Sequence, residues 1–167
     1  MLEFARQGDA QPSAEAVAER AGVGRRTVFR LFNDMESLYR EMHAVMMASI
    51  EDIKAIPISG DTVGERLACV IERRVRLYEE IMPIKSAADT QRWQSRFLQE
   101  AHEDVVGLLR QMLQFLLPKE IKEDADTFEA LDAVLSLDTW RRLRHDQNLS
   151  VKSARRVWEK MVAAIIA

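Results

Sequence analysis

The stretch that decides the fold lies near the N-terminus and reads Ser13-Ala14-Glu15-Ala16-Val17-Ala18-Glu19-Arg20-Ala21-Gly22-Val23-Gly24-Arg25-Arg26-Thr27-Val28-Phe29-Arg30-Leu31-Phe32. Ser13 is a favourable helix N-cap, and Glu15 follows in the first turn, where the helix dipole favours an acid. The apolar spacing after it predicts a helix of about two turns. Gly22 and Gly24 end this helix, and a second short helix begins at Arg25. Two short helices joined by a tight glycine turn are typical of a helix-turn-helix.

The same stretch is rich in arginine and carries no acid between residues 20 and 32; the arginines are Arg20, Arg25, Arg26 and Arg30. A guanidinium can bind a phosphate or the O6/N7 edge of guanine with two parallel hydrogen bonds. The free amides at the start of the second helix also favour phosphate. The pattern predicts contact with DNA, whereas a solvated helix face is the alternative for the same arginines.

The rest of the chain is poor in turn-forming residues, with 6 Gly and 4 Pro among 167 residues. This scarcity favours long helices and disfavours a β-sandwich. Apolar spacing predicts helices at residues 35–53, 62–81, 91–116, 126–145 and 151–166, a linker near 56–61 and a further short helix after Pro83. We therefore expect an all-α fold.

Several classes of protein are disfavoured by composition. The single cysteine, Cys69, permits no internal disulfide, and no apolar stretch approaches the ~18 residues of a membrane span. The histidines (His43, His102, His145) lack metal-ligand spacing, and no paired catalytic constellation is evident. We expect a cytoplasmic protein that is not an enzyme, has no cofactor or metal, and does not bind a membrane. The net charge of −3 leaves nucleic-acid binding open.

Residues 13–32 resemble the DNA-binding stretch of the TetR (tetracycline-repressor-like) family of bacterial regulators, and residues 33–38 and 131–144 resemble later parts of that family. The resemblance implies a homodimer in which an N-terminal three-helix helix-turn-helix head is joined to a larger helical core. The head with its connecting helix would span residues 1–54, and the ligand-binding and dimerisation domain residues 55–167. The resemblance places DNA contacts at Ser13, Gly24, Arg25, Arg26, Thr27, Phe29 and Arg30.

Three departures from the family pattern keep two functions open. Only Leu2 to Gln7 precede Gly8, so the first helix is short; Phe29 stands where a tyrosine is common, and Met35 where a lysine is common. The first hypothesis is a repressor that a small molecule releases from a palindromic double-stranded DNA operator. The alternative is a helical small-molecule-binding protein that has lost DNA binding.

A ligand cavity is expected among the residues that fill irregular space in the helical core. The candidates are Met46, Cys69, Arg73, Trp93, Phe97, His102 and Met112. The expected ligand is small and apolar or amphipathic. Core packing is the alternative role for the methionines and aromatic residues.

A dimer interface is expected on the last helices, because a two-fold operator requires a two-fold protein. Its candidate residues are Phe128, Leu131, Leu135, Ala154, Val157, Trp158, Met161 and Ile165. Packing inside the chain is the alternative for the apolar residues of the final helix.

Overall fold

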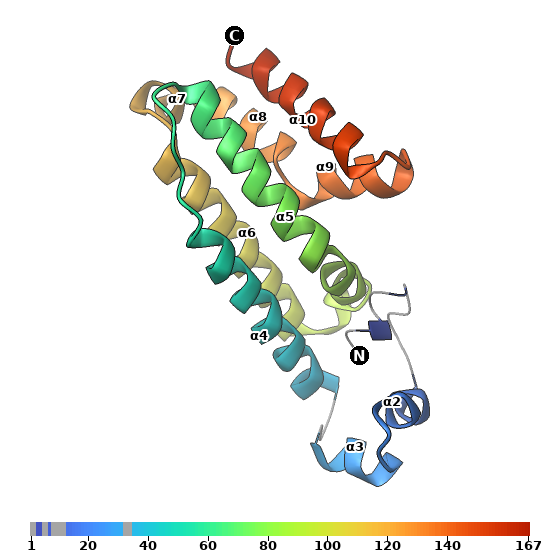
Figure 1. The fold of residues 1–167 in the computed structure, drawn as a ribbon. Helices are drawn as coiled ribbons and strands as arrows, with labels where there is room; N and C mark the ends of the chain where they lie inside the picture. The colour runs from blue at the N-terminus through green and yellow to red at the C-terminus, as the bar shows by residue number, and fades with distance from the viewer. Residues whose placement is uncertain (1–2, 5–6, 8–12, 32–34) are drawn as a thin grey trace. The chain divides into compact units, whose positions relative to one another are not determined.

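A computed structural model describes residues 3–4, 7, 13–31 and 35–167, and every regular element within these residues is helical (Figure 1). The all-α prediction is confirmed. The α-helices are α2 (Ala14–Ala21), α3 (Arg25–Leu31), α4 (Met35–Lys54), α5 (Val63–Asp89), α6 (Arg96–Leu116), α7 (Lys119–Glu123), α8 (Ala125–Val134), α9 (Leu137–Arg141) and α10 (Val151–Ile165). A 3₁₀ turn, η1 (Arg92–Gln94), precedes α6, and a π-helical turn, η2 (Arg142–Asp146), follows α9. In the described part of the chain, no helix has the length and apolar character needed to cross a membrane.

The chain forms two compact units, each built from two separate segments. Unit 1 comprises Met1–Glu51 and Ile81–Asp104, and unit 2 comprises Asp52–Glu80 and Val105–Ala167. The three long helices α4, α5 and α6 each contribute residues to both units. The boundaries of these two compact units differ from the predicted boundary between a DNA-binding part and a ligand-binding part at residue 54. That functional boundary stays a prediction.

In unit 1, α4 buries an apolar stripe that includes Leu38, Met42, Met46 and Ile50. These positions lie four residues apart and therefore share one face of the helix. Apolar spacing alone would also place Val45 on this face, since it lies three residues after Met42, but 43% of Val45 is exposed. The buried stripe passes beside that position.

Unit 2 has an aromatic core in which Trp140 and Trp158 are fully buried, with ring centroids 4.5 Å apart. Tyr78 packs edge-on against Trp158 at 5.9 Å. Helices α8 and α10 pack against each other within this unit (Figure 1). This unit buries the largest side chains of the described residues.

Helix α5 continues through Pro83, where the sequence predicted a break. An interior proline removes one backbone hydrogen bond and costs ~3 kcal/mol or more. The adjacent residues Ile81, Met82 and Ile84 are all buried. Since burial of one such side chain contributes about 1.5–3 kcal/mol, packing on both sides of the proline offsets its cost.

The single helix predicted at residues 126–145 is instead divided between α8, α9 and η2. The hydroxyl of Ser136 accepts a hydrogen bond from the Thr139 amide at 3.2 Å and caps α9. The Leu135 carbonyl at the end of α8 accepts hydrogen bonds from the buried side chains of Arg74 and Tyr78. Both new helix ends are therefore satisfied by side chains, which allows the break.

Candidate nucleic-acid interface and ligand cavities

The turn between α2 and α3 has the geometry that a helix-turn-helix requires (Figure 1). The Ser13 hydroxyl accepts from the Ala16 amide at 3.1 Å and caps the start of α2. At the other end Gly22 adopts φ +65°, a conformation that residues with a Cβ rarely take, and its amide donates to the Glu19 carbonyl. Gly24 then accepts from the Thr27 amide at 2.8 Å and starts α3. The predicted pair of short helices is confirmed.

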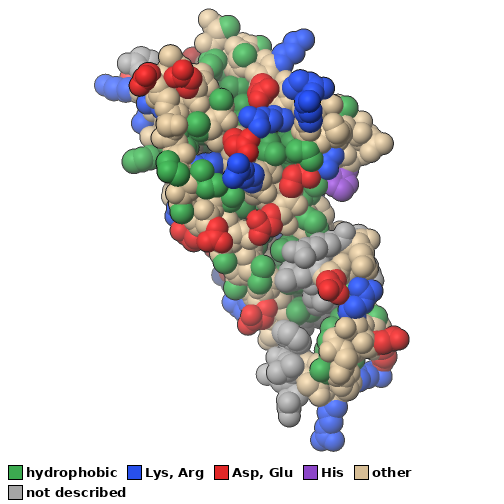
Figure 2. All heavy atoms as spheres, viewed as in Figure 1, with side chains coloured by type: hydrophobic (Ala, Val, Ile, Leu, Met, Phe, Trp, Pro, Cys, Tyr) green, Lys and Arg blue, Asp and Glu red, His purple; other side chains and the backbone are tan. Residues whose placement is uncertain are grey.

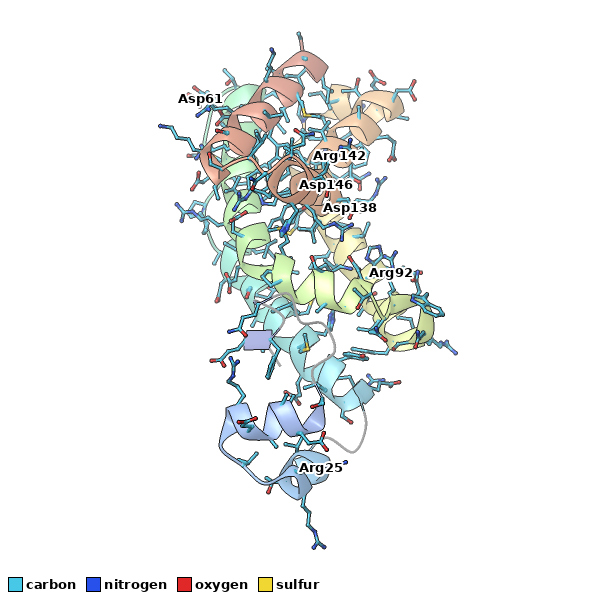
Figure 3. The ribbon with its side chains drawn as sticks, turned by 90° about the vertical axis from the view of Figure 1, so that its right-hand side faces the viewer. Arg25, Asp61, Arg92, Asp138, Arg142 and Asp146 are labelled. Atoms are coloured by element: carbon cyan, nitrogen blue, oxygen red, sulfur yellow. The ribbon has the colours of Figure 1, made fainter. Side chains whose placement is uncertain are left out.

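Arg25 and Arg26 are the first two residues of α3, and both are exposed. Figure 3 labels Arg25 at this end of the helix. Arg25 forms an ion pair with Glu15 of α2, whereas Arg26 forms none with any described residue. Thr27 in the same turn is half-buried. The start of α3 therefore presents two exposed arginines, of which Arg25 is paired with a carboxylate of the same head and Arg26 with none in the described part of the chain.

Arg20 is occupied within the head itself. Its guanidinium lies 3.4 Å from the Glu3 carboxylate and 4.7 Å from the centre of the Phe4 ring, and it donates to Gln7 at 3.4 Å. These contacts connect α2 to the residues before it. The surface formed by α2 and α3 accordingly carries side chains of both signs (Figure 2).

Two of the predicted DNA contacts cannot be placed by their side chains. Phe29 and Arg30 belong to α3, but their side chains lie outside the described ones. Phe32, at the end of the arginine-rich stretch, and most of the expected first helix also lie outside the described residues.

Unit 1 contains a cavity of about 360 Å³ between α4, the end of α5 and the start of α6. Its lining residues are Tyr39, Met42, His43, Met46, Ile84, Lys85, Ala88, Leu98, Ala101 and His102. Most of these are apolar, and the polar ones come from all three helices. This combination is typical of a small-molecule site.

Lys85 lies at the polar side of this cavity and contacts two other polar side chains. We call Lys85, Asp89 and His102 together the Lys85 cluster. The Lys85 ammonium lies 2.5 Å from the Asp89 carboxylate and 2.7 Å from Nδ1 of His102. Lys85 itself is only 5% exposed. A buried ammonium needs such partners because desolvation of an unpaired charge is costly.

His43 faces the same cavity, and its buried Nδ1 atom has no hydrogen-bond partner among the described residues. Burial lowers the pKa of His43 below the usual value, against the opposing effect of Asp104. The imidazole packs edge-on against Phe97 at 5.8 Å. Burial also raises the pKa of Tyr39, which keeps its hydroxyl protonated and able to donate.

A second cavity, of about 310 Å³, lies in unit 2. Its lining residues are Ile53, Ile58, Val70, Arg73, Arg74, Leu77, Leu109, Met112, Leu113 and Leu116. Arg74 donates to the carbonyls of Leu109 and Leu135 and so holds the backbone of two helices. Its role is structural.

The predicted ligand residues do not gather in one pocket. Met46 and His102 line the cavity of unit 1, and Arg73 and Met112 line that of unit 2. Cys69 lines neither of these cavities and donates to the Ser59 carbonyl at 3.3 Å.

The other two predicted ligand residues are aromatic. Phe97 also lines neither cavity, but packs on His43 and beneath the Arg40 guanidinium. Trp93 is 80% exposed because it belongs to the short turn η1, which buries none of its residues. The pocket prediction for Trp93 is wrong.

Sequence reasoning missed Tyr39, His43, Lys85 and Asp89. A signal for the first two was present, since Tyr39, Met42 and Met46 recur at helical spacing and His43 lies on the same face. Lys85 and Asp89 are four residues apart, a spacing that permits an ion pair on one helix. Within the described residues, no three His, Cys, Asp or Glu side chains lie close enough to hold a metal ion.

Most of the predicted interface residues belong to the chain's own core. Five of them are buried in unit 2: Phe128, Leu131, Leu135, Ala154 and Trp158. Since these side chains have no surface left for a partner, their assignment to a dimer interface is corrected. For the half-buried residues Val157, Met161 and Ile165 of α10, a role in a dimer interface stays a prediction.

Comparison with known proteins gives one match. Residues 2–42 match the family model described as bacterial regulatory proteins, tetR family. The matched segment contains α2, α3 and the start of α4, where the resemblance was found in the sequence, and that prediction is confirmed. No curated protein and no solved structure matches the chain.

Proposed function

We propose that this chain, whose residues 2–42 match the model of the tetR family of bacterial regulatory proteins, represses transcription from a palindromic operator until a small molecule releases it. The match supports a DNA-binding transcriptional regulator, because the matched model describes bacterial regulatory proteins. The observation that carries the proposal is the start of α3. There the exposed Arg26 and the adjacent Arg25 and Thr27 follow a glycine turn that suits insertion into a major groove.

The operator half-sites of such a protein lie one helical turn apart, about 34 Å, so that two recognition helices enter successive major grooves. This requires a homodimer, which we propose to form through the half-buried apolar residues of α10. Residues 1–54 would then serve as the DNA-binding part and residues 55–167 as the ligand-binding and dimerisation part. A regulator bound to chromosomal DNA would act in the bacterial cytoplasm.

Release by a ligand is supported by the position of α4 in the chain. This helix follows the head after three residues and lines the cavity of unit 1 with Tyr39, Met42, His43 and Met46. A ligand that binds better to a conformation with the two heads wrongly spaced would shift the population away from DNA. A coupling free energy of ~1–3 kcal/mol is typical for such a switch.

The test begins with selection of bound DNA from a pool of random duplexes, followed by titration of the selected site at fixed salt. Arg26→Ala should weaken binding by about five- to 150-fold, the range for a base-contacting arginine. Arg142→Ala is the matched control, because it removes an exposed arginine from unit 2 (Figure 3). Equal affinity for both variants and the parent would show that α3 is not the recognition helix.

The alternative function, a small-molecule-binding protein without DNA binding, is favoured by one observation. The acids Glu15 and Glu3 already engage Arg25 and Arg20 of the head. If the folded chain bound no duplex at low salt but still bound a small molecule, this alternative would replace the repressor.

A further inference from the structure

We propose that the cavity of unit 1 binds an amphipathic carboxylate, with the acid group at Lys85 and the hydrocarbon chain against the methionines of α4. The inference rests on the proposed ligand-responsive function for its biological consequence, but the binding itself can be tested without DNA. It assigns a chemical class of ligand and the group that recognises it.

The apolar part of the ligand is indicated by the walls of the cavity. Met42, Met46, Ile84, Leu98 and Ala101 are all buried and all line it. Methionine is flexible and fills irregular space, so these walls can accommodate a chain without a fixed ring shape. A ligand with one unbranched chain fits these features.

The polar part is indicated by the hydrogen-bond donors of Lys85. An ammonium carries three N–H donors. Two have partners in the Lys85 cluster, the Asp89 carboxylate and Nδ1 of His102. The third N–H is left for an acceptor, and Lys85 is one of the residues that line the cavity. A ligand oxygen can therefore complete the ammonium's hydrogen bonds.

The local charge favours an acid over a neutral acceptor. Lys85 and Arg92 both pair with the carboxylate of Asp89, at 2.5 and 3.9 Å, so two cations share this carboxylate. Asp104, the other acid that acts on this region, is exposed and therefore screened by water. A ligand carboxylate would give the buried Lys85 ammonium a second anionic partner through a charge-assisted hydrogen bond.

Two further groups can hold the second oxygen of the acid. The Tyr39 hydroxyl and the unpartnered Nδ1 of His43 belong to the same cavity lining. A cationic head group would instead face the Lys85 ammonium and be repelled.

The first experiment is calorimetric titration of the full chain, without DNA, with decanoate, decanol and decylamine. These probes share one hydrocarbon chain and differ in the head group. Decanoate should bind at least about tenfold more tightly than decanol, as one charge-assisted hydrogen bond provides, and decylamine should be the weakest. Equal binding of decanoate and decanol, or tighter binding of decylamine, would overturn the proposal.

Two variants locate the site. Lys85→Met should reduce the affinity for decanoate to that for decanol, while Lys152→Met, which removes an exposed lysine from α10, should change neither. Ala88→Leu places three more carbons in the cavity and should weaken both probes by about tenfold or more. If Lys85→Met loses its cooperative thermal transition, Ala88→Leu decides alone. Unchanged binding of decanoate to folded Lys85→Met or to Ala88→Leu would exclude this cavity.

The outcome is independent of the repressor hypothesis. A chain that binds decanoate as described but no duplex would retain this inference and refute the proposed function. A chain that binds its operator but not decanoate would refute this inference and leave the proposed DNA binding intact. Release of the selected duplex by decanoate, and not by decanol at equal concentration, would connect the two.

Discussion

Glu15 limits how much of the arginine charge is available on the DNA-binding head. Its carboxylate pairs with Arg25, and both side chains are more than half exposed. Exposed ion pairs contribute little to stability, since water screens them and the long side chains lose freedom. Glu15 therefore affects a neighbouring phosphate more than it affects the fold.

Glu15→Gln should raise the affinity for the selected duplex about two- to fivefold, the range of one exposed ion pair. In the parent, Arg25 must give up its ion pair with Glu15 before it can bind a phosphate, and the substitution removes that cost. The measurement is a titration at several salt concentrations, in which a steeper salt dependence would report the added phosphate contact. Glu19→Gln removes the same charge from the same helix, and Glu19 is exposed. An equal gain in Glu19→Gln would mean that net charge alone is responsible.

The arginine-rich stretch was evident in the sequence, but the partners of its arginines were not. Glu15 precedes Arg25 by ten residues and reaches it only because the Gly22 turn brings α3 back against α2. The same holds in the cavity, where His102 was predicted and Lys85 was not. Lys85 follows a proline in a helix that was expected to end, which concealed its position on a continuous apolar face.

Glu79 is one of the α5 side chains that join this helix to the later helices of unit 2. It accepts from the Trp140 indole at 2.9 Å and from two nitrogens of Arg144 at 2.8 and 3.1 Å. Burial disfavours ionisation of Glu79, but the hydrogen bonds from Arg144 and Trp140 outweigh it and lower the pKa of Glu79. The ionised form is thus the one that stabilises this contact.

Glu79→Gln should lower the free energy of unfolding by about 1 kcal/mol near neutral pH, because it weakens partly buried, charge-assisted hydrogen bonds. The pKa of Glu79 is lower in the folded chain than the ordinary value of about 4.3, so its contribution is complete above that value. It disappears as pH falls through the folded pKa, and the difference between parent and variant should shrink below about pH 4. Urea unfolding at several pH values measures this difference.

The control for this prediction is Asp146→Asn, an exposed carboxylate in η2 of the same region (Figure 3). Its stability should follow that of the parent at each pH. A constant difference between Glu79→Gln and the parent down to strongly acid solution would contradict the assigned ionisation.

Helix boundaries were predicted well where a local signal sets them and poorly where distant contacts do. Ser13 and Gly22 delimit α2 by their own capping hydrogen bonds. The end of α8 depends instead on Arg74 and Tyr78, residues about sixty positions away that bind the Leu135 carbonyl. No periodicity along residues 126–145 contains that information.

At the scale of the whole molecule, α10 is the element whose two faces differ most in role. Its buried face, with Ala154, Trp158 and Val162, completes unit 2. Val157, Met161 and Ile165 are only half-buried and are the predicted interface residues left for a second copy. Trp158 cannot serve there, because its substitution would disrupt the core before it affected association.

Met161→Glu should convert a dimer to monomers in light scattering, because a charge buried in an apolar interface has no partner. Far-ultraviolet circular dichroism should remain that of the parent, since Met161 is not part of the core. Ala163→Glu is the matched control, as Ala163 is exposed on the same helix. Dimers that persist in Met161→Glu would place the contact surface elsewhere.

The all-α fold could be predicted from the scarcity of glycine and proline together with apolar spacing. The division into two units could not, because it depends on which turns of α4, α5 and α6 pack together. Met46 and Met112 illustrate this limit, since similar residues on neighbouring helices line separate cavities.

The interleaved segments of the two units have a practical consequence for fragments of this chain. A truncated gene product ending at residue 54 would lack Ile81–Asp104, and with it the apolar surface that covers the stripe of α4. Met42, Met46 and Ile50 would then face water, and such a fragment should aggregate on expression. Dissection by protein cleavage is therefore a poor route to an isolated head, and point substitutions in the intact polypeptide are the better tool.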